Sequence, residues 1–93
     1  MNVYLLVYNE SCGTQEYVLD FIDTRTDILN WLVSFPSSVF IVSKKDITKL
    51  SKIFFKQFAG GMFVLTLIDN ENTDGLLMAH EWEFLNNPTA IDD

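Results

Sequence analysis

The chain has 93 residues, of which 48% are hydrophobic, 14% are aromatic and one is a cysteine. This length and composition predict a single packed domain over residues 1–88, and they exclude a disordered chain, an intrachain disulfide and a cysteine-based zinc site. The first ten residues lack a basic segment followed by a long apolar run. We therefore expect no signal peptide, no membrane span and a cytoplasmic location.

The formal net charge of −7 is unevenly distributed along the chain. Five of the six basic residues lie between Lys44 and Lys56, where only Asp46 is acidic, so this segment carries +4 and the rest of the chain carries −11. An acidic body with one basic segment argues against direct nucleic-acid binding and favours a basic partner.

The N-terminal half predicts two strands and a helix. Residues 2–9 are β-branched and aromatic and predict a strand. Residues 10–15 predict a hairpin loop, and residues 16–22 alternate like a second, antiparallel strand. A helix is expected over residues 24–35, because Thr24 and Asp27 resemble a capping box. Four apolar residues recur at helical spacing in that range, namely Ile28, Trp31, Leu32 and Phe35.

The C-terminal half predicts two more strands and a second helix. Residues 38–43 are almost continuously apolar, as in a central strand. Asp46 is a good N-cap for a helix over residues 47–58, which Gly60 and Gly61 end. Residues 62–68 predict a strand, residues 76–87 a strand that finishes as a short helix, and residues 89–93 a frayed tail.

The predicted order β-β-α-β-α-β, followed by a C-terminal element, indicates an α+β fold with both helices on one face of a sheet. Because the strands are apolar on both sides, the second face also needs a cover. We favour a homodimer that packs through Tyr4, Leu6 and Tyr8. The alternative is that the C-terminal segment folds across this face.

Three segments carry a family resemblance: a first strand that ends at Tyr8-Asn9, the strand Ser37-Ser38-Val39-Phe40-Ile41-Val42, and a closing Gly75…Trp82-x-Phe84-Leu85. With them the chain resembles small SinR-like proteins, which are related in shape to CRISPR-associated spacer-acquisition nucleases. The resemblance implies a ferredoxin-like antiparallel sheet and a dimer built around it. The nuclease branch of that superfamily carries an Asp at the end of the first strand that binds a divalent metal at the dimer seam, and the matching position here is Asn9. A neutral amide lacks the charge that a hard cation needs, which argues against nuclease activity.

Two charged groups of residues are candidate binding surfaces. The basic ridge follows one face of the second predicted helix and is either a track for phosphates or acidic partners or an ordinary solvated face. It consists of Lys45, Lys49, Lys52 and Lys56. The acidic residues either mimic nucleic-acid phosphates towards a basic partner or simply keep the surface soluble. They are Glu10, Glu16, Asp20, Asp23, Asp27, Asp69, Glu71, Asp74, Glu81 and Glu83.

No catalytic motif, cofactor fingerprint or metal-ligand spacing is found. His80 is the only histidine, so neither Cys12 nor the acids near His80 have the partners that nucleophilic or metal chemistry needs. Trp31 and Trp82 are either core residues or interface anchors. The sequence therefore indicates a dimeric, non-enzymatic protein-binding module that uses no cofactor. We interpret it as a phage or mobile-element inhibitor of a host nuclease or nucleic-acid-binding defence protein. The alternatives are a metal-dependent nuclease at a dimer seam, with Glu10 or Asp69 as ligand, and a structural dimer or assembly protein.

Overall fold

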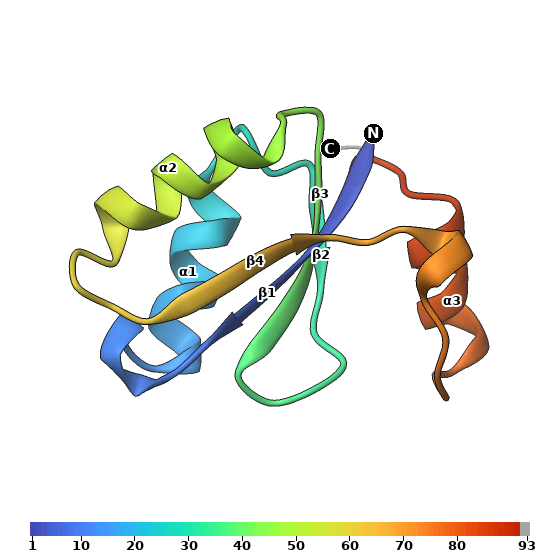
Figure 1. The fold of residues 1–93 in the computed structure, drawn as a ribbon, viewed down its shortest axis with the longest axis horizontal. Helices are drawn as coiled ribbons and strands as arrows, with labels where there is room; N and C mark the ends of the chain where they lie inside the picture. The colour runs from blue at the N-terminus through green and yellow to red at the C-terminus, as the bar shows by residue number, and fades with distance from the viewer. Residues whose placement is uncertain (92–93) are drawn as a thin grey trace.

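The computed structural model of the protein describes residues 1–91, which form a four-stranded antiparallel sheet and three α-helices. The fold is α+β, as predicted, and is compatible with a ferredoxin-like arrangement. Helices α1 and α2 lie together on one face of the sheet, and α3 lies on the other (Figure 1). The elements are β1 (Asn2–Tyr8), η1 (Glu10–Cys12), α1 (Gln15–Thr24), β2 (Asn30–Leu32), β3 (Ser38–Ser43), α2 (Ile47–Gln57), β4 (Phe63–Leu67), η2 (Asn70–Asn72) and α3 (Ala79–Asn86).

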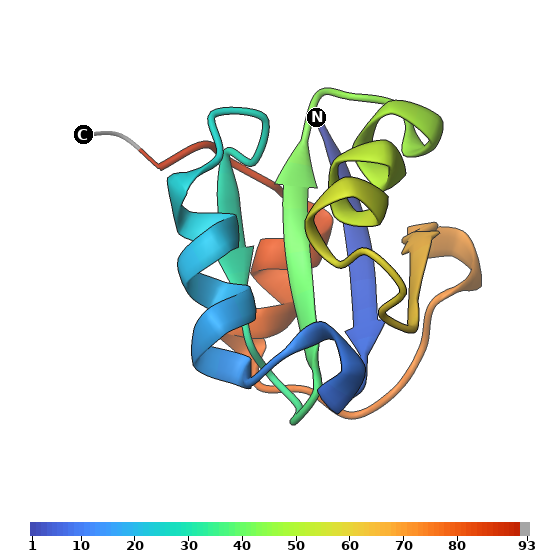
Figure 2. The same ribbon diagram turned by 90° about the vertical axis from the view of Figure 1, so that its left-hand side faces the viewer.

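The strand order is β2-β3-β1-β4, and every neighbouring pair is antiparallel (Figure 2). Helix α1 connects β1 to β2 across β3, and α2 connects β3 to β4 across β1, so two split β-α-β units interlock. In the centre of the sheet, Leu6 of β1 pairs with Val39 on one side and with Leu65 on the other.

The element order corrects the prediction in the N-terminal half. Residues 16–22 belong to α1 and not to a second strand, because the Thr14 side chain caps the helix by accepting a hydrogen bond from the Tyr17 amide. Val18 and Ile22, four residues apart, are both fully buried, which is the helical period. The predicted helix over 24–35 is also wrong, since that range contains β2.

Most of the C-terminal half follows the prediction, but the strand expected to begin at residue 76 does not form: within residues 1–91 only α3 follows η2. All six residues of β3 are buried, as expected for a central strand. Asp46 caps α2 by accepting a hydrogen bond from the Lys49 amide at 2.9 Å, and Gly60 takes a positive φ of 80° after the helix. Within residues 1–91, no helix has both the length and the apolar character that crossing a membrane requires.

Two apolar clusters lie on opposite sides of the sheet. The larger one, between the sheet and helices α1 and α2, contains Tyr4, Leu6 and Tyr8. These three residues are at most 6% exposed, so the prediction that they form a dimer face is wrong: they point towards the helices. The smaller cluster packs Leu85 of α3 against three residues of the second face, Val3, Phe40 and Val42. The C-terminal segment therefore covers part of the second face, as the alternative prediction proposed.

The segment that follows α3 lies along β2. The Asn30 side-chain amide donates to the Thr89 carbonyl at 3.1 Å, and the Ile91 amide donates to the Leu29 carbonyl at 2.9 Å. These contacts correct the expectation of a frayed tail for residues 89–91, and residues 92 and 93 lie outside the described range. The segment runs beside the start of β2 in Figure 2.

Candidate functional site

Three carboxylates line the exposed side of α1. Glu16, Asp20 and Asp23 are separated by four and three residues, so they share one face of the helix. All three are exposed, whereas Val18 and Ile22 bury the opposite face in the core. The burial of Val18 and Ile22 therefore turns the acidic face of α1 away from the sheet. Three of the ten predicted acids thus share one helix face beside the sheet edge formed by β2.

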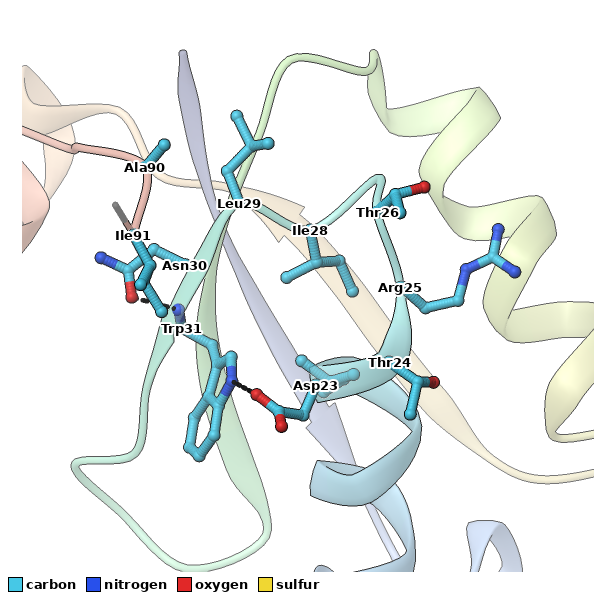
Figure 3. Close-up of a pocket in the computed structure, with 11 residues that line it drawn as sticks. Asp23, Thr24, Arg25, Thr26, Ile28, Leu29, Asn30, Trp31, Ala90 and Ile91 are labelled. Carbon is cyan, nitrogen blue, oxygen red and sulfur yellow. Dashed lines mark hydrogen bonds between the residues drawn. The ribbon is translucent and has the colours of Figure 1, made fainter. Parts of the chain in front are cut away.

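A groove runs between this acidic face and β2. It encloses about 430 Å³, and its remaining lining residues include Leu19 and Trp31. The indole nitrogen of Trp31 donates a hydrogen bond to the Asp23 carboxylate at 3.2 Å (Figure 3). This hydrogen bond fixes the orientation of the ring, so an aromatic surface lies next to three carboxylates. We call this region the acidic groove and define it by Glu16, Leu19, Asp20, Asp23 and Trp31.

A second depression of about 350 Å³ continues from the acidic groove, because Asp23 and Trp31 line both. It lies between the end of α1, the loop before β2 and the C-terminal segment, where Ala90 and Ile91 form part of its wall (Figure 3). Two distant parts of the chain therefore meet at Trp31. The sequence indicates Trp31 as a possible interface anchor but predicts it on a helix. It therefore does not predict that Trp31 in β2 and Leu19 in α1 line one groove.

Asp27 is not part of this surface. It is paired with Arg25 and, at 3.5 Å, with Lys45, and its side chain is 16% exposed. The hydrogen bond from Arg25, supported by the positive charges of Arg25 and Lys45, lowers the pKa of the Asp27 carboxyl. Both salt bridges within residues 1–91 thus converge on Asp27, which holds the loop after α1 against the start of α2.

The other predicted acids do not join the groove. Glu10 lies in η1 at the far end of β1. Asp69 accepts hydrogen bonds from the Glu71 amide at 3.0 Å and the Asn72 side chain at 2.6 Å. Glu81 accepts one from the Met78 amide at the start of α3. The remaining three are exposed in η2, in the loop after it and on α3, and they are Glu71, Asp74 and Glu83.

The residues considered for a nuclease do not converge within one chain. Glu10 and Asp69 follow opposite ends of the β1–β4 pair, roughly 25 Å apart by strand rise. The Asn9 side-chain oxygen accepts a hydrogen bond from the Ser11 amide at 2.9 Å and thereby caps η1. Among residues 1–91, no three His, Cys, Asp or Glu side chains group closely enough to hold a metal ion.

Cys12 is 5% exposed, and its thiol donates to the Met62 carbonyl at 3.3 Å. Burial raises the pKa of this thiol, although hydrogen bonds from Asn9 and Ser11 act in the opposite direction. The environment thus favours the protonated, unreactive form.

The basic ridge is exposed on α2 and in the turn before it. Lys49, Lys52 and Lys56 lie on the helix, and Lys45 precedes it and contacts Asp27. Phe55, between Lys52 and Lys56, is 65% exposed, and its ring lies 5.0 Å from that of Phe63 on β4. The ridge therefore lies on the half of the helical layer that covers β4.

Comparison with known proteins gives no relative. No family model matches the chain, and neither the curated proteins nor the solved structures contain a match. The fold and the groove define a class only: a small α+β protein with an acidic, aromatic surface groove. The resemblance to SinR-like proteins stays a prediction.

Proposed function

We propose that this protein is a non-enzymatic binding module that docks a basic surface of another protein in the acidic groove. One observation carries the proposal: Glu16, Asp20 and Asp23 lie on one exposed helix face that borders Trp31. None of the three takes part in a salt bridge within residues 1–91. Their negative charges are therefore available to an external cation.

The chemistry of the groove matches a lysine or arginine side chain. An arginine can donate paired hydrogen bonds to a carboxylate while its planar group lies against an indole ring. Leu19 offers an apolar contact for the methylene part of the same side chain. Because the contact relies on charge, we expect the affinity to fall as the salt concentration rises.

The partner class that fits best is a protein with a basic nucleic-acid-binding groove. Such grooves are built to attract closely spaced phosphates, and carboxylates at helical spacing present a comparable row of negative charges. In this proposal the protein is a cytoplasmic inhibitor, encoded by a phage or mobile element, of a nuclease or defence protein. The nuclease alternative has less support, because the described residues of one chain contain no group of three acids or other ligands for a metal ion.

The test is a nuclear magnetic resonance titration of the labelled protein with a short arginine- and leucine-containing peptide. We expect the largest shifts at the Trp31 indole and at the amides of Leu19 and Asp23. Asp20→Asn should weaken binding about threefold to fivefold, the range of a solvent-exposed charge pair. Glu83→Gln is the matched control, since Glu83 is also an exposed helical acid but lies on α3. Equal weakening by both variants would refute a specific groove.

The choice of partner class needs a second measurement. Tagged protein should retain a nucleic-acid-binding protein from bacterial lysate, and added duplex DNA should displace it. Retention that Asp20→Asn leaves unchanged would contradict the proposal, because the acidic groove would then not carry the contact.

A further inference from the structure

The outer edge of β4 is an unpaired edge of the sheet, which makes it a second candidate binding surface besides the acidic groove. β4 is the last strand of the sheet, and nothing within residues 1–91 pairs with its outer side. The opposite edge differs, since the C-terminal segment hydrogen-bonds along the start of β2. An open strand edge offers a row of backbone donors and acceptors to another extended chain.

The hydrogen-bond pattern shows which backbone groups are free. Ile68 donates to the Val3 carbonyl at 2.9 Å, and Asn9 donates to the Met62 carbonyl at 3.4 Å. Since hydrogen-bonded pairs alternate along an antiparallel ladder, Val64 and Thr66 face β1 in the same way. The amide and carbonyl groups of the residues between them therefore point outwards from the sheet. These residues are Phe63, Leu65 and Leu67.

Apolar side chains flank this edge on both sides of the sheet. On the helical side Phe55 is 65% exposed and Leu67 is 51% exposed, and on the opposite side Val64 is 63% exposed. The neighbouring Val7, which pairs with Val64, is also exposed. A strand that paired with β4 would cover apolar surface on both of its faces.

We propose that this edge binds an acidic, extended segment of a partner protein, which adds to the sheet as a fifth strand. The positive charge on α2 favours this occupant. Phe55 of α2 lies 5.0 Å from Phe63 of β4, and Lys52, one helical turn before Phe55, shares its helix face. Lys56 follows Phe55 directly and adds a second positive charge to this end of α2. A second copy of this chain is a less favourable occupant. Two-fold pairing of two β4 strands would put the lysines of both copies on the same side of the joined sheet, where their like charges repel.

This proposal is independent of the acidic groove, since it uses the opposite edge of the sheet and the opposite sign of charge. The two surfaces would allow the protein to hold a basic surface and an acidic strand at once. Binding at β4 would mainly use main-chain hydrogen bonds for affinity and the lysines for choice of partner.

The experiment uses a blocked nine-residue peptide that alternates valine and glutamate, with a valine–lysine peptide as the comparison. We expect the glutamate peptide to bind about tenfold more tightly at low salt. Its addition should slow hydrogen exchange at the Phe63, Leu65 and Leu67 amides, because only strand addition gives them acceptors. Lack of protection at these amides, or equal binding of both peptides, would overturn the proposal.

Two variants separate the charge from the strand pairing. Lys52→Glu should weaken the glutamate peptide about fivefold, whereas Lys44→Glu, the same change at an exposed lysine before α2, should have little effect. Leu67→Pro removes an outward donor and should abolish binding while the β1–β4 ladder is kept. Circular dichroism checks that this variant folds. Two other outcomes would each refute the acidic-strand assignment. They are protection that rises with protein concentration alone, which indicates a second copy, and tighter binding of single-stranded DNA.

Discussion

The packing of α3 on the second face of the sheet can be tested by removing one side chain. Leu85 is 2% exposed and contacts the cluster of Val3, Phe40 and Val42. Leu85→Ala deletes three carbon atoms, whose transfer from water is worth about 0.8 kcal/mol each, and leaves a cavity as well. We expect a loss of about 2–4 kcal/mol in the free energy of unfolding.

This loss is large for a chain of 93 residues, whose total stability is about 5–14 kcal/mol by the usual per-residue range. The midpoint of thermal unfolding should fall by roughly 10–20 °C. Urea unfolding, monitored by tryptophan fluorescence and circular dichroism, measures the free energy of unfolding and its dependence on urea concentration. The variant should also bind a hydrophobic dye more strongly, since a displaced α3 would uncover Val3, Phe40 and Val42.

Leu76→Ala is the matched control for this experiment. Leu76 is 94% exposed, so the same chemical change should alter the stability by no more than about 0.5 kcal/mol. If both variants lost the same amount, or if Leu85→Ala unfolded like the parent, α3 would not be packed on the sheet. The residues Val3, Phe40 and Val42 would then need another cover.

Two further predictions concern Asp27 and Cys12. The pKa of Asp27 is lowered in the folded state, so its stabilising effect is complete above its unfolded value of about 3.9 and is lost as the pH falls through the folded value. Asp27→Asn should lower the free energy of unfolding by roughly 0.5–1 kcal/mol at pH 7. In urea unfolding, the difference in stability between variant and parent should shrink as the pH falls below about 4. A difference that does not shrink on acidification would contradict the ion pair. The buried Cys12 thiol should react with a disulfide reagent at least about tenfold more slowly in the native protein than in urea, and equal rates would contradict its burial.

The strand and helix periods explain which parts of the fold the sequence predicted. Four elements have sequence patterns that fit only one type of secondary structure, namely β1, β3, α2 and β4. Examples are the six consecutive buried residues of the strand β3 and the Asp46 N-cap of the helix α2. The segment Glu16–Ile22 satisfies two patterns, since its apolar residues alternate and also recur at the helical spacing. Thr14 lies in the predicted loop, and its side-chain cap on the Tyr17 amide is the local signal that decides for a helix.

The wrong prediction of a helix over residues 24–35 follows from the wrong prediction of a strand over residues 16–22. Once Glu16–Ile22 was placed on a strand, Thr24 resembled a helix start, although it is the last residue of α1. The acidic positions could be read from the chain, but the groove could not. It depends on Trp31 in β2 lying beside α1, a contact that only the β1-α1-β2 crossover creates.

The separation of charge along the chain becomes a separation in space because each crossover places its helix over a different half of the sheet. α1 connects to β2 and carries Glu16, Asp20 and Asp23, whereas α2 leads to β4 and carries the lysines. Salt bridges between the acids of α1 and the lysines of α2 would neutralise both sets of charges. Within residues 1–91 the salt bridges instead use Asp27 alone, outside both helices. The fold thus leaves two surfaces of opposite sign at opposite edges of one sheet, so that a charge change on α1 and a charge change on α2 test the two proposed contacts separately.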